Sequence, residues 1–481
     1  MAGRWFVRLT LYNLACRENQ RGIHNTKYLR LATLPGVPAQ HPAYSLPGAD
    51  LSPADWSPEG CAHMIIQWLA KRGIYYGWAV IGVMFVTLFM ALGLRFAFGV
   101  FYVAILQDTG WARGETAAIF SISMAVYALT IVLSGALFDR FGPRRLFPAA
   151  AVVLCVGLVL CSTITSVWRF YLYYGVLVGA SFAMLGFPTH MAVVPRWFVR
   201  KRGLASALAL SGVGIGSLLI TLLTERLVLG IGWRSTYVVY GLLILAVLVP
   251  LNLLIHRESP QALGLQPDGA AEPPPELTAN GTEGFTLRAA MRAPAWWMLL
   301  VAVSMIGFSS MTMVVHQTRL SLDLGYDLGT ASLLFGMTGI TRTAGQLTWG
   351  SLSDRFGRSP IYLTVTVLGL LGIACLFLAR GSPQFIYLAG FTLLFGFGYM
   401  GLSPVYASTV ADLFPGRHLG KILSMLDIGF GVGASSGPWL AGYLFDRTGS
   451  YDDMLLLISA SVVVTGVAMY LATRQRPPLL A

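Results

Sequence analysis

Residues 135–145 read G-A-L-F-D-R-F-G-P-R-R, and residues 350–360 read G-S-L-S-D-R-F-G-R-S-P. The second stretch repeats the first, with glycine, leucine, aspartate, arginine and phenylalanine at the same spacing. The positions that matter below are Gly135, Asp139, Arg140, Gly142 and Arg144 in the first copy and Gly350, Asp354, Arg355 and Gly357 in the second. Each copy joins two long apolar segments. A charged hinge repeated between apolar segments predicts a chain of two homologous halves.

The composition indicates whether most of the chain lies in water or in a lipid bilayer. Of its 481 residues, 56% are hydrophobic and only 11% are charged, and the mean hydropathy is +0.67. Soluble proteins carry about 25% charged residues, so we expect a membrane protein in a lipid bilayer. The net charge of +12 does not indicate a nucleic-acid partner, because the basic residues lie in short links between apolar runs.

The sequence lacks the residue patterns typical of disulfide frameworks, metal sites and enzyme active sites. The five cysteines are Cys16, Cys61, Cys155, Cys161 and Cys375, and no two of them form a CxxC pair. We therefore expect neither disulfides nor a metal site. No Ser/His/Asp, Cys/His, HExxH or phosphate-loop pattern is present in the sequence, so we expect no enzyme activity and no cofactor.

The first 70 residues differ from the rest of the chain. They are polar, rich in proline after Leu34, and contain no methionine between Met1 and Met64. We expect a disordered extension here. One alternative is that the natural protein starts at Met64, and another is a functional cytoplasmic tail. N-terminal sequencing of the natural protein would distinguish the two, since a mature chain that begins at Met1 would exclude the start at Met64.

Twelve segments are long and apolar enough to cross a bilayer, which takes about 20 residues each. They are 77–102, 115–138, 146–165, 168–192, 203–226, 234–256, 294–318, 328–352, 359–380, 384–411, 420–443 and 453–473. The longest link, 257–293, is rich in proline and predicts an irregular linker between six-span halves. We therefore expect an all-α membrane protein with six-helix bundles at 71–256 and 294–476.

The basic residues also predict the orientation of the spans. If the N-terminus lies in the cytoplasm, most lysines and arginines of the links fall on the cytoplasmic side, as the positive-inside rule requires. Examples are the links that contain Arg144, Arg200 and Arg288. We expect both termini to be cytoplasmic and the protein to lie in the cell (inner) membrane.

The repeat extends beyond the hinge. Glycines of the fifth span recur at one constant spacing in the eleventh: Gly203, Gly212, Gly214 and Gly216 match Gly420, Gly429, Gly431 and Gly433. Because each half has six spans, both halves have the same orientation. They are therefore predicted to be parallel repeats related by an axis along the membrane normal.

The hinge motif between spans 2 and 3, repeated between spans 8 and 9, resembles the loop motif of the major facilitator superfamily. Four further strings are similar to the monocarboxylate porter branch and its oxalate/formate-exchanger relatives. They are Y-Y-G-W at 75–78, R-W-F-V-R-K-R-G-L-A-S-A at 196–207, G-L-Q-P-D-G at 264–269 and G-Y-L-F-D-R-T-G-S-Y at 442–451.

The resemblance implies a transporter that works by alternating access, with proton symport or anion exchange as the energy source. It implies a small organic anion as substrate, in particular a monocarboxylate. Two alternatives remain open: an exporter of hydrophobic compounds, and a membrane receptor that binds a ligand without transporting it.

Ionisable residues inside spans are functional candidates, because they are costly in hydrocarbon. Arg95 in span 1 is expected to bind a carboxylate, or else to be an arginine that reaches the outer interface. Arg342 in span 8 is a candidate substrate ligand, or a structural ion pair with Asp427 of span 11. Asp427 is also a candidate for the coupling proton. His316 is either a proton-linked residue or, because it lies late in span 7, a solvated histidine.

The resemblance adds two expectations about roles. Porters of this branch often carry a span-8 arginine that binds carboxylate, and here Gln346 stands in its place, with Arg342 one helical turn earlier. In the superfamily the hinge aspartate holds neighbouring helix ends in one state of the cycle, which implies a gating role for Asp139, Arg140 and Arg144. The second hinge has Ser359 and Pro360 where the first has Arg144 and Arg145, so we expect less gating from Asp354.

Overall fold

The computed structural model describes residues 68–69, 71–199, 201–257, 259–269, 285–415 and 419–475. The chain divides into two units, Met1–Gly73 and Ile74–Ala481. Apart from residues 71–73, both predicted six-helix bundles fall within the second unit. The predicted extension at 1–70, with the alternative start at Met64, lies almost entirely outside the described residues, and so does the middle of the linker, 270–284.

The first half contains the first six predicted spans. Span 1 comprises α3 (Gly77–Phe96) and α4 (Phe98–Thr109), and spans 2 and 3 are α5 (Arg113–Phe141) and α6 (Pro143–Ser162). Span 4 is a series of short elements: α7 (Val167–Phe170), the π-helix η3 (Tyr171–Val178), α8 (Gly179–Met184), α9 (Phe187–Met191) and α10 (Val194–Trp197). Spans 5 and 6 lie in α11 (Arg202–Ile255).

The linker adds two short 3-10 turns, η4 (Pro260–Leu263) and η5 (Pro267–Gly269), and α12 (Leu287–Arg292) precedes the second half. Spans 7 to 9 are α13 (Pro294–Asp323), α14 (Leu328–Phe356) and α15 (Arg358–Gly381). Span 10 comprises α16 (Phe385–Phe397), η6 (Tyr399–Leu402) and α17 (Ser403–Leu413), and spans 11 and 12 are α18 (Leu419–Thr448) and α19 (Asp452–Arg474).

Each of the twelve predicted spans is therefore helical, and the all-α membrane fold is confirmed. Nine helices of the described residues are long and apolar enough to cross a membrane. One of them, Gly203–Ile255, has 53 residues and covers two predicted spans. Gly232, with a φ of 78°, breaks the helix between these two spans. The predicted spans 8 and 11 are α14, with 29 residues, and α18, with 30.

The repeated hinge requires glycine for a local reason. Gly142 ends α5 with a φ of 69°, and Gly357 ends α14 with a φ of 85°. Residues with a side chain rarely adopt such values. In both copies the next helix starts at the following residue, Pro143 or Arg358. The hinge is thus a one-residue reversal between two long helices, used in the same way in each half.

The repeated glycines serve the same contact inside each half. Gly216 of α11 lies so close to the Phe89 carbonyl of α3 that an added Cβ would clash with it, and Gly433 of α18 lies in the same way against the Ser304 carbonyl of α13. Spans 1 and 5 of one half therefore cross as spans 7 and 11 of the other do. This shared crossing supports the predicted internal repeat.

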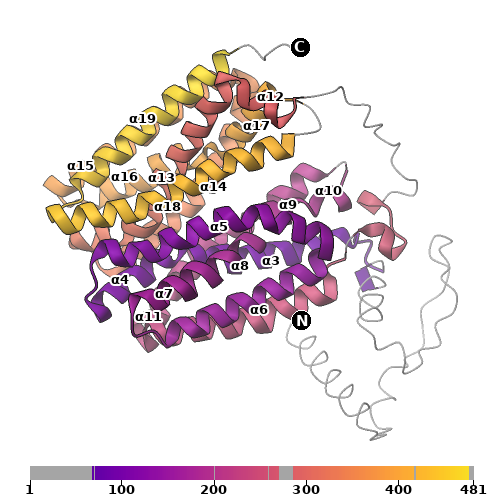
Figure 1. Cartoon of the computed structure of the whole chain (residues 1–481), viewed down its shortest axis with the longest axis horizontal. Coiled ribbons are helices and arrows are strands. Elements are labelled where there is room, and N and C mark those ends of the chain that lie inside the picture. The colour runs from indigo at the N-terminus through magenta and orange to yellow at the C-terminus, as the bar shows by residue number, and fades with distance from the viewer. Residues whose placement is uncertain are drawn as a thin grey trace, which may run out of the picture. The chain divides into compact units, whose positions relative to one another are not determined.

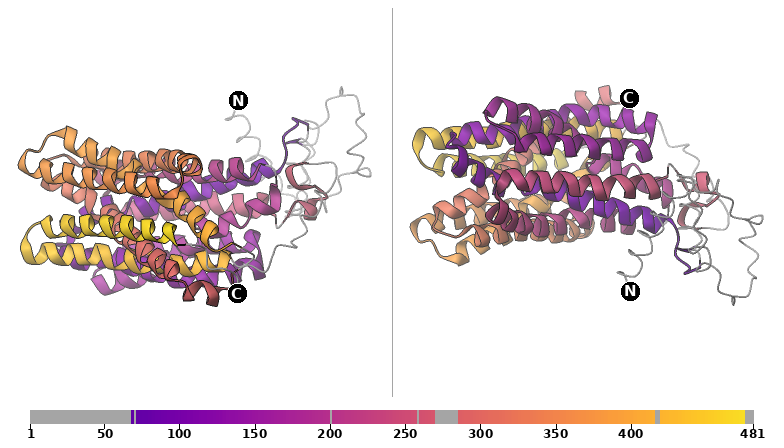
Figure 2. Two further views of the ribbon diagram at one scale, coloured as in Figure 1. Left: turned by 90° about the horizontal axis from the view of Figure 1, so that it is seen from above. Right: turned by 90° about the horizontal axis from the view of Figure 1, so that it is seen from below.

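Within the repeated glycines Gly212, Gly214 and Gly216 and their matches Gly429, Gly431 and Gly433, the middle glycine contacts the other half. Gly214 of α11 contacts Thr343 of α14, and Gly431 of α18 contacts Ala128 of α5, again with no space for a Cβ. The two halves thus meet along α11 with α14 and along α5 with α18. Figure 1 shows α5 beside α18, and Figure 2 shows that the long helices of this unit run along a common direction.

Candidate functional site

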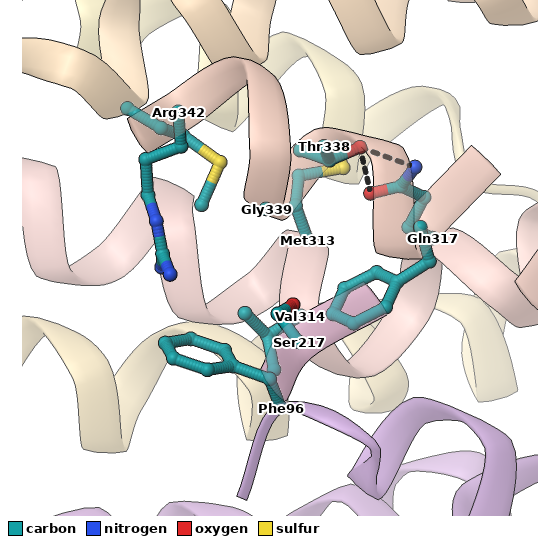
Figure 3. Close-up of a pocket in the computed structure, with 10 residues that line it drawn as sticks. Phe96, Ser217, Met313, Val314, Gln317, Thr338, Gly339 and Arg342 are labelled. Carbon is teal, nitrogen blue, oxygen red and sulfur yellow. Dashed lines mark hydrogen bonds between the residues drawn. The ribbon is translucent and has the colours of Figure 1, made fainter. Parts of the chain in front are cut away.

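A small cavity lies between the two halves (Figure 3), where α3 and α11 of the first half face α13, α14 and η6 of the second. The lining residues are Phe96, Ser217, Met313, Val314, Gln317, Phe335, Thr338, Gly339, Arg342 and Met400. Most of these side chains are apolar. A ligand in this cavity would therefore be oriented by a small number of polar contacts, as is usual for small-molecule sites.

Arg342 of α14 carries the one formal charge among the lining residues. Its guanidinium carbon lies 4.4 Å from the centre of the Phe96 ring, and Figure 3 shows both groups on the same side of the cavity. Its Nε is buried without a hydrogen-bond partner. None of the salt bridges between described residues includes it. Arg342 as a whole is partly buried, and a cation withdrawn from water without a counter-ion is costly, so this arrangement favours a role in binding an anion.

Gln317 and Thr338 add a neutral polar pair to the cavity. The Gln317 amide nitrogen donates to the Thr338 hydroxyl at 3.1 Å, and that hydroxyl lies 3.0 Å from the Leu334 carbonyl. Gln317 is buried. Thr338 lies one helical turn before Arg342, so both side chains are on one face of α14. The pair can therefore hydrogen-bond a ligand that contacts the guanidinium.

Arg95 is buried, with only 5% of its surface exposed. Its Nη2 lies 2.7 Å from the sulfur of Met124, and its guanidinium carbon lies 4.5 Å from the centre of the Tyr127 ring. The alternative of an arginine that reaches the membrane interface is therefore wrong, because the side chain packs against α5 instead. Arg95 is not a lining residue of the cavity, but its charge is close enough to act on Arg342.

Asp427 of α18 is partly buried and has no ion pair among the described residues. The predicted structural pair between Arg342 and Asp427 is therefore not formed in this state. The charge of Asp427 acts electrostatically on the hydroxyl groups of Tyr127 in α5 and Tyr406 in α17. The middle of the bundle thus holds two cations, Arg95 and Arg342, and one separate carboxylate.

Gln346 is half-buried and lies one turn beyond Arg342 on α14. Its amide nitrogen donates to the Ser403 hydroxyl at the start of α17, 3.2 Å away. Gln346 is not among the lining residues of the cavity. The structure therefore brings Arg342 to the cavity and directs Gln346 to a contact between α14 and α17.

His316 is fully buried, so the prediction of a solvated histidine is wrong. The reason is that α13 continues for two more turns, to Asp323. The Nδ1 of His316 lies 3.1 Å from the Tyr451 hydroxyl, and its Nε2 lies 2.9 Å from the Pro438 carbonyl. Both ring nitrogens are therefore used within the protein.

Arg113 connects the halves at one end of the bundle, which we call the Arg113 end. Its Nη1 lies 2.6 Å from the Asp323 carboxylate of α13 and donates to the Tyr451 hydroxyl at 2.9 Å. Its guanidinium carbon lies 3.5 Å from the centre of the Phe445 ring. The backbone nitrogens of Arg113 and Gly114 donate to the Asp446 carboxylate. In this structure the Arg113 end is closed by polar contacts between the halves.

The opposite end carries both hinges, and we call it the Asp139 end. Asp139 is 80% exposed and lies 3.9 Å from Arg196, and the Arg144 Nε donates to the Leu253 carbonyl at 3.3 Å. Arg140 packs on the Phe141 ring. These contacts all stay within the first half.

The second hinge has the shorter ion pairs. Arg358 lies 2.7 Å from Asp354 and 3.0 Å from Asp412 at the end of α17. Arg355 packs on the Phe356 ring. These contacts stay within the second half. Among the ion pairs of the described residues, those at the Asp139 end therefore do not join the two halves.

The closure by Arg113 and the cavity pair Gln317–Thr338 are not evident in the sequence. Arg113 is separated from Asp323 by 210 residues, and no local pattern links them. Asp446 and Tyr451 do lie within the string 442–451. The four-residue spacing of Thr338 and Arg342 is the pattern that could have indicated the second polar position of the cavity.

The sequence is similar to one described protein family and to several known transporters. The sequence matches the family described as Major Facilitator Superfamily over residues 83–323 and 297–480. It is 29% identical over 392 residues to monocarboxylate transporter 13 of Bos taurus, with 81% of this chain and 86% of that protein covered. It is 27% identical to monocarboxylate transporter 11 of Mus musculus, with 84% and 88% covered. It is 26% identical to the uncharacterized MFS-type transporter YhjX of Escherichia coli (strain K12), with 72% and 82% covered.

A solved structure shares the fold. It is the inward-facing, occupied form of a bacterial homolog of the human lysosomal transporter Spinster. The TM-score is 0.67 at 14% sequence identity, with 83% of this chain and 97% of that chain covered.

Proposed function

The chain belongs to the Major Facilitator Superfamily, and on that premise we propose that it carries a small organic anion, in particular a monocarboxylate, by alternating access. It is a multi-pass membrane transporter that resembles the monocarboxylate-transporter branch. The observation that carries the proposal is Arg342, a partly buried cation without a counter-ion among the described residues, in a cavity between the halves.

The charges near the cavity favour a monoanion. Arg95 and Arg342 contribute two positive charges, and Asp427 contributes one negative charge when it is ionised. One carboxylate in the cavity would therefore bring the site to neutrality, which lowers the cost of burying the charges. Arg342 can hold a carboxylate with two parallel N–H···O bonds, and Gln317 and Thr338 can contact a neutral group beside it.

Asp427 is the group we assign to the coupling proton in a symport mechanism. Protonation of Asp427 removes the one negative charge near the two arginines and so strengthens their attraction for an anion. In anion exchange, by contrast, Asp427 would stay ionised, and a second anion would reload the site on the return step. The two mechanisms differ in whether transport responds to a pH gradient.

The closed Arg113 end fits one state of an alternating-access cycle. We assign the Asp139 end to the cytoplasm, because the arginines of both hinges cluster there. This orientation would place both termini in the cytoplasm, and we propose the cell (inner) membrane as the location. In the opposite state the Asp139 hinge would close the cytoplasmic end while the contacts of Arg113 separate.

Uptake into liposomes that contain the purified protein tests the proposal. Labelled short monocarboxylates should accumulate, and Arg342→Gln should abolish that accumulation. Arg169→Gln removes an exposed arginine of α7 that does not line the cavity, and this variant should transport normally. Uptake of uncharged hydrophobic compounds in place of anions would favour the exporter, and binding without counterflow would favour the receptor. A response to an imposed pH gradient would distinguish symport from exchange.

A further inference from the structure

His316 lies where four elements of the Arg113 end meet. It is on α13, and its ring packs edge-on against the Tyr102 ring of α4 at a centroid distance of 5.1 Å. The Pro438 carbonyl of α18 lies 2.9 Å from its Nε2, and the Tyr451 hydroxyl, just before α19, lies 3.1 Å from its Nδ1. A fully buried histidine is thus in contact with residues from both halves.

The hydrogen-bonding partners assign a tautomer and a protonation state to this ring. A carbonyl oxygen only accepts, so the Nε2 of His316 carries a hydrogen and donates it to Pro438. The Tyr451 oxygen accepts a hydrogen bond from the Arg113 guanidinium at 2.9 Å, so its own hydrogen points to the Nδ1 of His316. His316 is therefore neutral while the Arg113 end is closed. The lone pair on its Nδ1 accepts the hydrogen bond from the Tyr451 hydroxyl.

A proton on Nδ1 would disrupt this chain of donors. Two hydrogens would face each other between His316 and Tyr451, so the tyrosine hydroxyl would have to turn away. Among the hydrogen bonds of the described residues, that hydroxyl has no other acceptor. A buried O–H without an acceptor costs free energy, and two cationic donors, His316 and Arg113, would then converge on one oxygen.

The surrounding charges do not compensate for an added proton. The charges that act on His316 are Arg113 from α5 and Asp323 from its own helix. Arg319 and Asp446 act on its ring neighbour Tyr102, and Arg319 also acts on Tyr451. The one arginine and the one aspartate that act on His316 cancel, and so do Arg319 and Asp446 beside Tyr102. Asp452, the next carboxylate along the chain, is paired with Arg380. A positive His316 would therefore be an unpaired buried charge.

We propose that His316 is a proton-binding latch of the Arg113 end: a proton on Nδ1 holds this end open, and closure requires its release. The proton returns to the side from which it came, so this site regulates the cycle and is separate from the coupling role assigned to Asp427. The proposal rests on alternating access and not on the identity of the substrate. Acid on the Arg113 side is expected to slow the carrier by retaining it in the open state.

The test measures the opening of this end directly. Spin labels at Thr163→Cys and Gln384→Cys lie on exposed links of the two halves at the Arg113 end, in a chain whose five native cysteines are replaced by alanine. Double electron–electron resonance in lipid nanodiscs, without substrate, gives the ratio of open to closed states. We expect this ratio to rise as the pH falls from 8 to 5, by up to about tenfold per pH unit for one linked proton.

His316→Gln should remove that response and remain closed, because its amide can donate to Pro438 and accept from Tyr451. His190→Gln is the matched control, since His190 is also fully buried but lies in the first half, stacked on Phe147. It should respond to pH as the unsubstituted chain does. A pH response that persists in His316→Gln, or that is lacking in the unsubstituted chain, would overturn the latch.

Tyr451→Phe provides a second test if His316→Gln does not fold. It removes the hydroxyl that occupies Nδ1, so the closed fraction at pH 8 should fall and the pH response should weaken. An unchanged closed fraction together with an unchanged pH response would contradict the proposal. Since no substrate is present in either experiment, a failure to transport monocarboxylates would leave these results interpretable.

Discussion

Asp446, in the last turn of α18, caps a helix that belongs to the other half. Its carboxylate accepts the backbone N–H of Arg113 at 2.9 Å and that of Gly114 at 2.7 Å. The local N-cap residue of α5, Ala112, provides no side-chain bond. The start of α5 therefore depends on the second half for its cap, and the cap is lost whenever the Arg113 end opens.

Asp446→Ala should shift the equilibrium toward the open state. An N-cap contributes about 1 kcal/mol, so we expect roughly a fivefold rise in the ratio of open to closed states at pH 8. The cross-half spin-label distance measures this ratio. Asp453→Asn is the control, because Asp453 lies in the first turn of α19 and makes no described contact with α5. An unchanged ratio in Asp446→Ala would show that the cap does not stabilise closure.

Arg342→Gln should have opposite effects on the free and the ligand-bound protein. Without ligand, removal of a partly buried, unpaired cation should raise the melting temperature. With a monocarboxylate, the stabilisation by ligand should disappear, since a hydrogen bond to a charged group contributes about 1.5–3 kcal/mol, or roughly 10- to 150-fold in affinity.

Thermal unfolding with and without ligand measures both effects of Arg342→Gln. Arg342→Lys keeps the charge but loses the bidentate geometry, so its affinity should be intermediate. The control Arg169→Gln should change neither value. A lower melting temperature for ligand-free Arg342→Gln would show that the arginine is a structural residue.

The fold follows from local features that the sequence displays openly. Apolar segments of the right length, a glycine at each one-residue hinge and glycines at repeated positions all act through neighbouring residues or through helix periodicity. Gly142 and Gly357 are needed because of the backbone, and Gly216 and Gly433 because of a helix crossing. Such features can be recognised in a single sequence without knowledge of the partners.

The site could be predicted only in part, for the same reason. Arg342, Arg95 and Asp427 are visible because a charge inside an apolar segment is rare. Whether two such charges pair depends on helix rotation and packing, and the predicted pair of Arg342 with Asp427 is not formed. The burial of His316 depends on Tyr102, Pro438 and Tyr451, which lie far away in the sequence.

Gly431→Ala should disfavour the state described here. Its Cβ would clash with Ala128 of α5, so the two halves could not approach as closely at this crossing. Overpacking of this kind costs about 1–3 kcal/mol, which predicts a shift toward the open Arg113 end. Gly82→Ala is the control, because no atom lies within 4 Å of its added Cβ. Equal spin-label distances for both variants would contradict the importance of this crossing.

Tyr451 predicts how closure responds to alkali. Burial raises the pKa of Tyr451 to about 12, although Arg113 acts in the opposite direction. The contribution of its protonated hydroxyl is therefore complete below pH 10, the usual pKa, and is lost as the pH rises through about 12. The closed fraction should be constant between pH 8 and pH 9.5 and should fall above pH 10. Tyr451→Phe should lack this alkaline transition, and a loss of closure below pH 9 in both proteins would assign it to another group.

The two hinge aspartates, Asp139 and Asp354, differ in the ion pairs that their carboxylates make in this structure. Asp139 is 80% exposed and 3.9 Å from its nearest basic partner, so it is available for a new contact when the Asp139 end closes. Asp354 is already paired with Arg358 at 2.7 Å, and Arg358 also binds Asp412 at 3.0 Å. The loss of one carboxylate thus leaves the second hinge with an ion pair but leaves the first without its acceptor.

Asp139→Asn should therefore impair transport more than Asp354→Asn does. If Asp139 makes one charge-assisted bond in the other state, its loss costs about 1.5 kcal/mol or more. That corresponds to roughly a tenfold shift toward the state with the Arg113 end closed. Uptake rates and the cross-half distance measure the two effects together. Asp354→Asn should remain within about twofold of the unsubstituted rate, as expected for exposed ion pairs. If both variants lost transport equally, the hinges would share the gating role, and the pairing of Arg358 with Asp412 would not compensate for Asp354.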